Sequence, residues 1–367
     1  MAGRSKLARN ARPTFLSLFS GCGGLDLGFE QAGFRCVGAT DLEKTAAASF
    51  KANFTSVPFW LGSIADLNAA KLASEFPDLA KGLDVLVGGP PCPPFSKSRF
   101  YRKDKPRALD DPNGKDTIEG YLRVLAETQP RAFLLENVRG LAYKVHSDAL
   151  DHIVDTADRL GYTVSKQVLN AADFGVPQIR ERFFVIGVRE GPFRFPAPTH
   201  TREPGLLSDL DRWVTAGDVL ADLDTDENAD DSGHFAGGQF HHLLRQVPPG
   251  DNYLFFTKER GHPSPIFKWR SRYWSFLLKL SPDAPAWTVQ ARRSNNMGPF
   301  HWRNRILRIA EIKRLQTFPD DFALVGTTEQ QWRQIGNAVP PLLARHLADA
   351  MGAAVSAARP ERAYAAG

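Results

Sequence analysis

Leu83–Ser96 reads LDVLVGGPPCPPFS, and the fold can be worked out from this stretch. A short run of apolar and β-branched residues ends in two glycines, and prolines then flank Cys92. The run predicts a buried strand. The glycines allow the backbone to approach a ligand closely, and the prolines fix φ and remove donors. Cys92 is expected at the carboxyl end of a strand, where open α/β sheets bind ligands, although a buried cysteine in a proline turn would read the same way.

The composition is that of a globular protein with a modest basic excess. The chain has 367 residues, a formal net charge of +5 and a hydrophobic content of 43%. This length predicts two domains, or one large domain with an insertion. The basic excess suits a polyanionic partner.

The cysteine content and the hydropathy of the chain indicate the cellular compartment of the protein. The three cysteines, Cys22, Cys36 and Cys92, form a sparse and odd set, which argues against a disulfide framework and against a zinc site. No metal is therefore expected. The first residues lack the apolar region of a signal peptide, and no apolar run approaches the length of a membrane span. We expect a soluble cytoplasmic protein without a membrane partner.

A glycine-rich turn near the amino terminus predicts a ligand site. A strand expected over 14–19 leads into Ser20–Phe29, which reads SGCGGLDLGF. Such a turn between strand and helix allows close backbone approach to a ligand, although a tight turn alone would look alike. The dinucleotide spacing fails because Asp26 holds its last glycine position. A second strand, 34–41, ends in Asp41, which is placed either to bond ribose hydroxyls or to cap a helix.

Two further segments place charged side chains at strand ends. The strand expected over 131–138 carries Glu136 after four apolar residues, and the resulting desolvation should raise the pKa of this carboxyl. In the extended segment before the strand 183–188, alternation puts Gln178, Arg180 and Arg182 on one side. Arginines in this position can pair with anions or hydrogen-bond a base.

Two basic stretches fit nucleic-acid binding. Residues 97–107 hold six basic residues and one acid, and are expected to form a loop that closes over phosphates. Residues 291–310 hold five arginines among aromatics and no acid. The alternative for residues 97–107 is a solvated run of charges, and the alternative for residues 291–310 is a pair of surface strands. The composition changes at Gly191, where we place a domain boundary.

Six segments, in order, resemble the motifs of the C5-cytosine DNA methyltransferase family of the prokaryotic restriction-modification type. The similarity covers about half of the chain. The matching segments are Phe19–Leu25, Gly89–Cys92, Glu136–Val138, Gln178-x-Arg180-x-Arg182, Arg314–Pro319 and Gly336–Val339.

This resemblance implies an α/β fold with two unequal parts. One is a doubly wound, mostly parallel sheet of the S-adenosylmethionine-dependent methyltransferase type, and the other is a smaller target-recognition domain. We assign residues 1–191 to the large domain and 192–325 to the small one. Residues 326–367 are expected to return to the large domain, with the last helix beside the first.

The resemblance also implies a mechanism on DNA. Cys92 would add to C6 of a cytosine flipped out of a double-stranded sequence, and C5 would then take the methyl group. Glu136 would hold a proton at N3 and Arg182 would bond O2, with Arg180 supporting the site. Flipping is needed because a base inside a duplex is out of reach.

Binding residues follow from the same resemblance. The S-adenosylmethionine site is expected to comprise Phe19, Ser20, Gly21, Gly23, Gly24, Leu25, Asp41, Leu42, Ser63, Ile64, Pro90, Asn337 and Ala338. DNA contacts are expected from Ser96, Lys97, Ser98, Arg99, Gln178, Arg292, Arg293, Arg303 and Arg305, the last four mostly with phosphates.

Two departures from the family and two alternative functions stand beside this interpretation. Pro93 replaces the usual glutamine after the catalytic cysteine, and Ser63 stands where an acid usually bonds adenine. The alternatives are a tRNA cytosine-5 methyltransferase and a DNA-binding relative without activity. A cognate restriction enzyme is expected as a genetic rather than physical partner, and the chain is expected to be a monomer.

Overall fold

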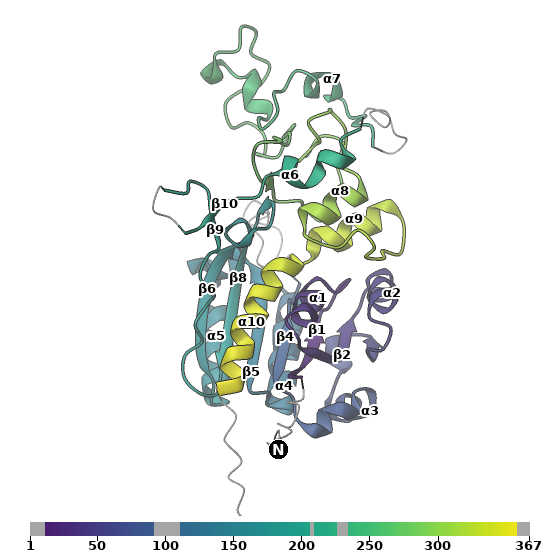
Figure 1. Cartoon of the computed structure of the whole chain (residues 1–367), viewed down its shortest axis with the longest axis vertical. Helices are drawn as coiled ribbons and strands as arrows, with labels where there is room; N and C mark the ends of the chain where they lie inside the picture. Colours follow the sequence, from purple (N-terminus) through teal and green to yellow (C-terminus); the bar gives the residue numbers. More distant parts are fainter. Residues whose placement is uncertain (1–11, 92–110, 206–208, 226–233, 358–367) are drawn as a thin grey trace, which may run out of the picture.

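The computed structural model describes residues 12–91, 111–205, 209–225 and 234–357 (Figure 1). Cys92, Pro93 and the loop that we expected to clamp DNA, including Ser96, Lys97, Ser98 and Arg99, lie outside these residues.

A seven-stranded, mostly parallel sheet forms the centre of the described chain. Its strand order is β3-β2-β1-β4-β5-β8-β6. The first five of these strands run parallel, and β8 is antiparallel to both of its neighbours. The strands are β1 Thr14–Leu18, β2 Arg35–Asp41, β3 Phe59–Leu61, β4 Val85–Gly88, β5 Ala132–Val138, β6 Thr163–Asn170 and β8 Glu181–Val188. The predicted doubly wound α/β fold is confirmed.

Apolar side chains cover both faces of the sheet, which explains the near-continuous apolar runs of its strands. In β4, Val85 and Val87 join one apolar cluster while Leu86 joins the other. Helices complete both layers (Figure 1). The helices are α1 Gly24–Gln31, α2 Lys44–Asn53, α3 Ala69–Glu75, α4 Pro112–Thr128, α5 Ser147–Arg159, α6 Ala216–Leu220, α7 His241–Leu244, α8 Ile309–Leu315, α9 Thr328–Asn337 and α10 Pro341–Ala357.

The last helix, α10, packs directly on α1, as the family resemblance implied. A Cβ at Gly28 would lie 2.4 Å from the Cβ of Ala344, so only glycine allows this approach. The helix runs to Ala357, and Met351 and Val355 continue its buried face. The carboxyl-terminal segment therefore completes the core of the large domain.

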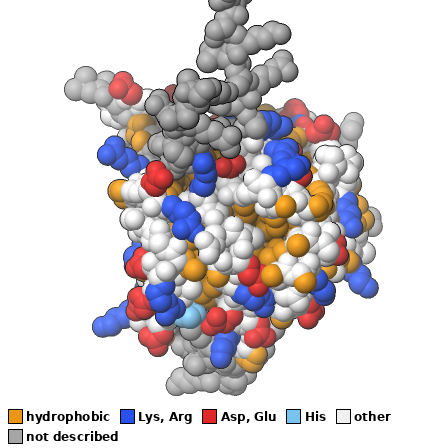
Figure 2. Space-filling view, turned by 90° about the horizontal axis from the view of Figure 1, so that it is seen from below, with side chains coloured by type: hydrophobic (Ala, Val, Ile, Leu, Met, Phe, Trp, Pro, Cys, Tyr) orange, Lys and Arg blue, Asp and Glu red, His pale blue; other side chains and the backbone are white. Residues whose placement is uncertain are grey.

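Residues 192–308 form the less regular part of the described chain. They hold the short strands β9 His200–Thr201, β10 Asp211–Arg212 and β11 Ala286–Trp287, and β11 pairs with β7, Gln178–Ile179. This part lies beyond the carboxyl ends of the sheet strands (Figure 1). At the other end of the molecule, acidic and basic side chains are interspersed (Figure 2).

The return to the large domain involves residues before 326. Phe322 contacts Phe54 at the end of α2, and Val325 N donates to Ser49 Oγ at 2.7 Å. The three-part division with limits at 191 and 325 remains a proposal.

Candidate active site

Two segments meet at the carboxyl end of the sheet, just before Cys92. β4 and β5 pair in register, with Gly88 opposite Leu135. Beyond the strand end, a Cβ at Gly89 would lie 2.9 Å from Glu136 Oε2. Asn137 Nδ2 donates to Pro90 O at 3.1 Å. The chain that leads to Cys92 is thus held against the end of β5, although Cys92 itself lies outside the described residues.

Glu136 and Arg182 form a buried ion pair at this strand end. Arg182 Nε lies 2.8 Å from Glu136 Oε1, and both side chains are largely buried. Burial raises the pKa of Glu136, and the charges of Arg182 and Arg180 only partly oppose this effect. A carboxyl in this setting can retain a proton more readily than an exposed glutamate.

Arg180 and Gln178 connect the sheet to the later segments of the chain. Arg180 is fully buried and donates to Gly336 O at 2.7 Å, Ala338 O at 3.0 Å and Val289 O at 3.1 Å. Gln178 is also fully buried, and its amide bonds Leu315 O and Val289 N. Arg180 therefore supports the site through the backbone. The expectation that Gln178 contacts DNA is wrong, because none of it is accessible.

The glycine-rich turn after β1 meets the last family motif. Gly21 and Gly23 have φ of 56° and 97°, in the left-handed region that favours glycine. A Cβ at Gly24 would lie 2.5 Å from Val339 O and 3.0 Å from Ala338 Cβ. The candidate cofactor residues at both ends of the chain, Asn337 among them at the end of α9, thus come together.

Asp41 and Leu42 lie beside this turn. Asp41 accepts from Gly21 N and from Glu43 N, each at 2.8 Å, and burial raises its pKa. Leu42 is 70% exposed, which leaves an apolar surface for a purine ring. A carboxylate for ribose hydroxyls, a glycine turn and an exposed apolar side chain fit S-adenosylmethionine in chemical type.

The remaining cofactor candidates differ in exposure. Phe19 is partly buried with φ of 55°, whereas Ser20, Leu25 and Ile64 are buried. Ser63 Oγ accepts from Ala65 N at 3.3 Å, capping the short helix Ile64–Asp66. The local cap explains a serine at this position, where the family usually has an acid.

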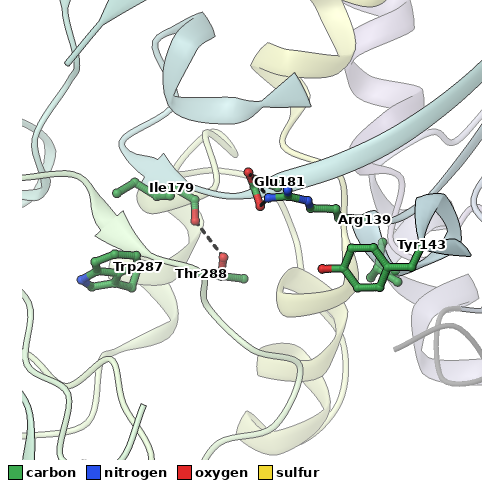
Figure 3. Close-up of a pocket in the computed structure, with 8 residues that line it drawn as sticks. Arg139, Tyr143, Ile179, Glu181, Trp287 and Thr288 are labelled. Atoms are coloured by element: carbon green, nitrogen blue, oxygen red, sulfur yellow. Dashed lines mark hydrogen bonds and ion pairs between the residues drawn. The ribbon is translucent and has the colours of Figure 1, made fainter. Parts of the chain in front are cut away.

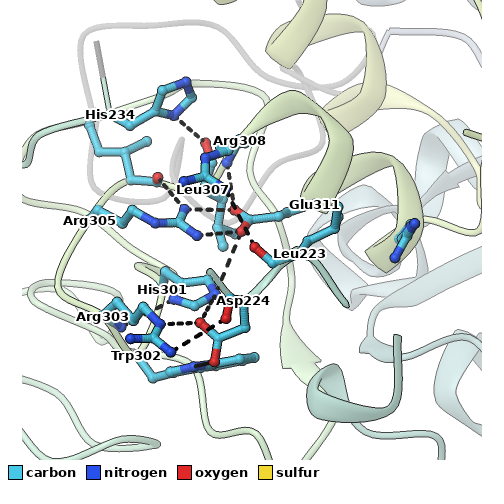
Figure 4. Close-up of polar contacts among 12 residues, drawn as sticks. Leu223, Asp224, His234, His301, Trp302, Arg303, Arg305, Leu307, Arg308 and Glu311 are labelled. Atoms are coloured by element: carbon cyan, nitrogen blue, oxygen red, sulfur yellow. Dashed lines mark hydrogen bonds and ion pairs between the residues drawn. The ribbon is translucent and has the colours of Figure 1, made fainter. Parts of the chain in front are cut away.

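The four arginines expected to hold phosphates fall into two groups. Arg292 is exposed and Arg293 partly exposed, so both remain available to DNA. Arg305 is fully buried against Glu311, with Nη1–Oε2 at 2.9 Å and Nη2–Oε1 at 2.5 Å (Figure 4). The phosphate role expected for Arg305 is therefore wrong. Arg303 is one-third exposed and pairs with Asp224.

The network around Arg305 joins the irregular part to α8. Trp302 Nε1 donates to Asp224 Oδ2 at 2.9 Å, and Arg308 N donates to Glu311 Oε2 at 2.7 Å (Figure 4). His301 is buried beside these groups, and burial lowers its pKa to about 4. The cluster is structural, and sequence reasoning missed it because its arginines resemble a phosphate-binding stretch.

Together, the sheet order, the glycine turn and the buried acid define a methyltransferase of the S-adenosylmethionine-dependent class. A sequence model described as C-5 cytosine-specific DNA methylase matches residues 13–353. The chain therefore belongs to the C-5 cytosine-specific DNA methylase family and is a DNA cytosine-5-methyltransferase that uses S-adenosylmethionine.

Similar proteins support this family at the level of the whole chain. The type II methyltransferase M.SacI of Streptomyces achromogenes is 41% identical over 353 residues, covering 89% of each chain. M.NgoFVII of Neisseria gonorrhoeae is 35% identical, covering 90% of this chain and 84% of its own. A crystal structure titled as a prophage-encoded DNA modification methyltransferase (E. coli) shares the fold, with a TM-score of 0.65, 24% identity and 94% and 99% coverage.

The described residues hold neither a membrane-spanning helix nor a cluster of metal ligands. Among the ranges within 12–357 that the structure describes, no helix is long and apolar enough to cross a membrane. No cluster of three potential metal ligands occurs in those same ranges.

A pH-dependent stability is predicted from Asp26 in the first turn of α1. Its side chain is fully buried, and burial raises its pKa to about 7 from 3.8. The folded state therefore keeps a proton that the unfolded chain loses near pH 4. The associated stability is fully present below pH 4 and is lost as the pH rises to about 7, on the order of 4 kcal/mol in all. Urea unfolding of Asp26→Asn should show a weaker fall over this window, and an unchanged fall would contradict the assignment.

A second prediction distinguishes the buried Arg305 from the exposed Arg292. Arg305→Ala removes the guanidinium that pairs with the buried Glu311, so it should lower the free energy of unfolding by about 3–5 kcal/mol. Arg292→Ala, the exposed control, should change stability little but reduce the salt dependence of DNA binding by about one contact. Denaturant titration and DNA binding at several salt concentrations test both. A stable Arg305→Ala protein with a reduced salt slope would restore the phosphate role.

Proposed function

We propose that this chain modifies one cytosine in a specific sequence of double-stranded DNA, as the methyltransferase of a restriction-modification system. The similar type II methyltransferases support the assignment to a restriction-modification system. A cognate restriction enzyme, a monomeric state and a cytoplasmic location beside the DNA belong to the same proposal.

The observation that carries the residue-level mechanism is the Glu136–Arg182 pair beside Gly89 and Pro90. It combines a guanidinium with a carboxyl of raised pKa that lies against Gly89, three residues before Cys92. A cytosine flipped from the duplex, at a cost of a few kcal/mol, can present N3 and O2 to these two groups.

Each residue then has a chemical role. The Cys92 thiolate adds to C6 of cytosine, which makes C5 nucleophilic. Glu136 holds the proton at N3, and Arg182 donates to O2, so the adduct does not build up negative charge. S-adenosylmethionine supplies the electrophilic methyl group. After C5 gains the methyl group and S-adenosylhomocysteine leaves, water takes the C5 proton. The electron pair of the C5–H bond then restores the C5–C6 double bond, the S–C6 bond breaks and the thiolate is regenerated.

Cys92 is predicted to form a covalent adduct with duplex DNA that carries 5-fluorocytosine at the target. Fluorine replaces the proton that must leave C5, so the S–C6 bond cannot break. Denaturing electrophoresis should show the adduct for the wild type and not for Cys92→Ser. Cys22→Ala is the control and should keep the adduct, because Cys22 is buried and burial raises its pKa to about 12. An adduct with Cys92→Ser would refute the assignment.

Glu136→Gln should slow methyl transfer without a comparable loss of cofactor binding, since its carboxyl acts on the base. A general acid contributes roughly a hundred- to ten-thousand-fold to the rate. Single-turnover methylation and S-adenosylmethionine binding measure the two effects, with the exposed Glu75→Gln as a matched control. A single-turnover rate close to wild type would remove Glu136 from the mechanism.

A further inference from the structure

An exposed tryptophan pair lies near the candidate active site. Trp274 is 51% exposed and Trp287 is 38% exposed, and their rings meet edge to face at 5.6 Å. Tyr273 and Trp269, which precede Trp274 closely in the sequence, are also exposed. Large apolar side chains grouped on a surface usually mark a contact with a partner.

Trp287 is held on the strand edge that leads to Arg182. In β11, Trp287 pairs with Ile179 of β7, and Thr288 Oγ1 donates to Ile179 O at 2.7 Å. The preceding Ala286 is fully buried. The ring therefore projects from a fixed backbone, and a contact made by it needs little ordering.

A pocket of about 350 Å³ separates Trp287 from the large domain. Figure 3 shows Trp287 and Tyr143 on opposite sides, with the ion pair between Arg139 and Glu181 at 2.8 Å between them. Val138 also lines the pocket and lies opposite Arg182 in the β5–β8 ladder. Ile179 and Glu181 also line the pocket and alternate with Arg182, so the pocket lies across the strand from the Glu136–Arg182 pair and within one residue of it along the chain.

The distance along the chain limits what Trp287 can contact. Its partner Ile179 is three residues before Arg182, which is roughly 10 Å in an extended strand. A base whose edge faces Glu136 and Arg182 is therefore out of reach of Trp287, but the next nucleotide is not.

Charge identifies the partner of this surface. Residues 258–274 carry Lys258, Arg260, Lys268, Arg270 and Arg272 against the single acid Glu259. The Arg270 guanidinium lies over the Trp269 ring, with 5.8 Å to its centroid. A second pocket, of about 660 Å³, adjoins this stretch and includes Arg270, Arg272 and Asn296. Arg260 pairs with Asp251 at 2.6 Å, and the other four cations lie in sequence among aromatic residues, a composition that suits nucleic acid.

We propose that Trp287, supported by Trp274, packs against the nucleotide next to the target cytosine and holds the opened duplex. The inference rests on the proposed function. It assigns a positioning role to an aromatic pair, while the chemistry stays with Cys92, Glu136 and Arg182.

The test uses the full-length protein and a duplex that it methylates, identified by bisulfite sequencing. Trp287→Ala should weaken duplex binding by about 5- to 150-fold, the range of one lost base–aromatic stack, and Trp287→Phe should retain most of the affinity. With 2-aminopurine beside the target cytosine, the fluorescence change on binding should shrink in Trp287→Ala. Leu61→Ala removes an equally exposed apolar side chain from the distant edge strand β3 and should change neither signal.

Other outcomes would overturn the proposal. Wild-type affinity and an unchanged 2-aminopurine signal in Trp287→Ala would show that the ring does not contact DNA. If light scattering shows that the wild type self-associates and Trp287→Ala does not, with equal DNA affinity, the surface is an interface between copies. S-adenosylmethionine binding without DNA, expected to be unchanged, reports that the variant is folded. A wild-type protein that binds but methylates no DNA would refute the proposed function, while the affinity comparison would still decide the role of Trp287.

Discussion

The 2.8 Å contact between Arg182 Nε and Glu136 Oε1 is possible because β8 runs antiparallel to β5. In this ladder Val138 faces Arg182, so the start of one strand delivers a guanidinium to the carboxylate near the end of the other. A buried carboxylate without such a partner would be costly. With it, the carboxyl has a raised pKa yet remains tolerated in the core, which is the state that a proton-holding group requires.

Several parts of the chain converge to keep this pair in place. Asn137 fixes Pro90 beside Glu136, and Arg180 ties β8 to backbone oxygens of residues 289, 336 and 338. These hydrogen bonds hold the carboxyl-terminal residues against the sheet. The same segment closes the glycine turn, where Gly24 meets Val339. The candidate cofactor site and the proposed base site thus share one set of supporting contacts, and we expect changes in α9 to affect both.

The sequence predicted the sheet because its strands and turns depend on local patterns. An apolar run that ends in Gly-Gly-Pro-Pro, or a glycine-rich turn after a strand, can be recognised from about ten consecutive residues. Arg305 and Gln178 could not be judged in this way. Arg305 pairs with Glu311 only once the chain bends back at His301–Ile306, and Gln178 bonds Leu315, which is 137 residues away. Exposure, which separates Arg292 from Arg305, is a property of the tertiary structure.

In the proposed mechanism, Glu136 and Arg182 receive the target cytosine beside Cys92. A crystal structure with the methylated duplex site and S-adenosylhomocysteine tests it most directly. We expect an extrahelical cytosine with N3 facing Glu136, O2 facing Arg182 and C6 next to Cys92 Sγ. A cytosine that stays stacked in the duplex, or an extrahelical base that does not contact Glu136, would contradict it.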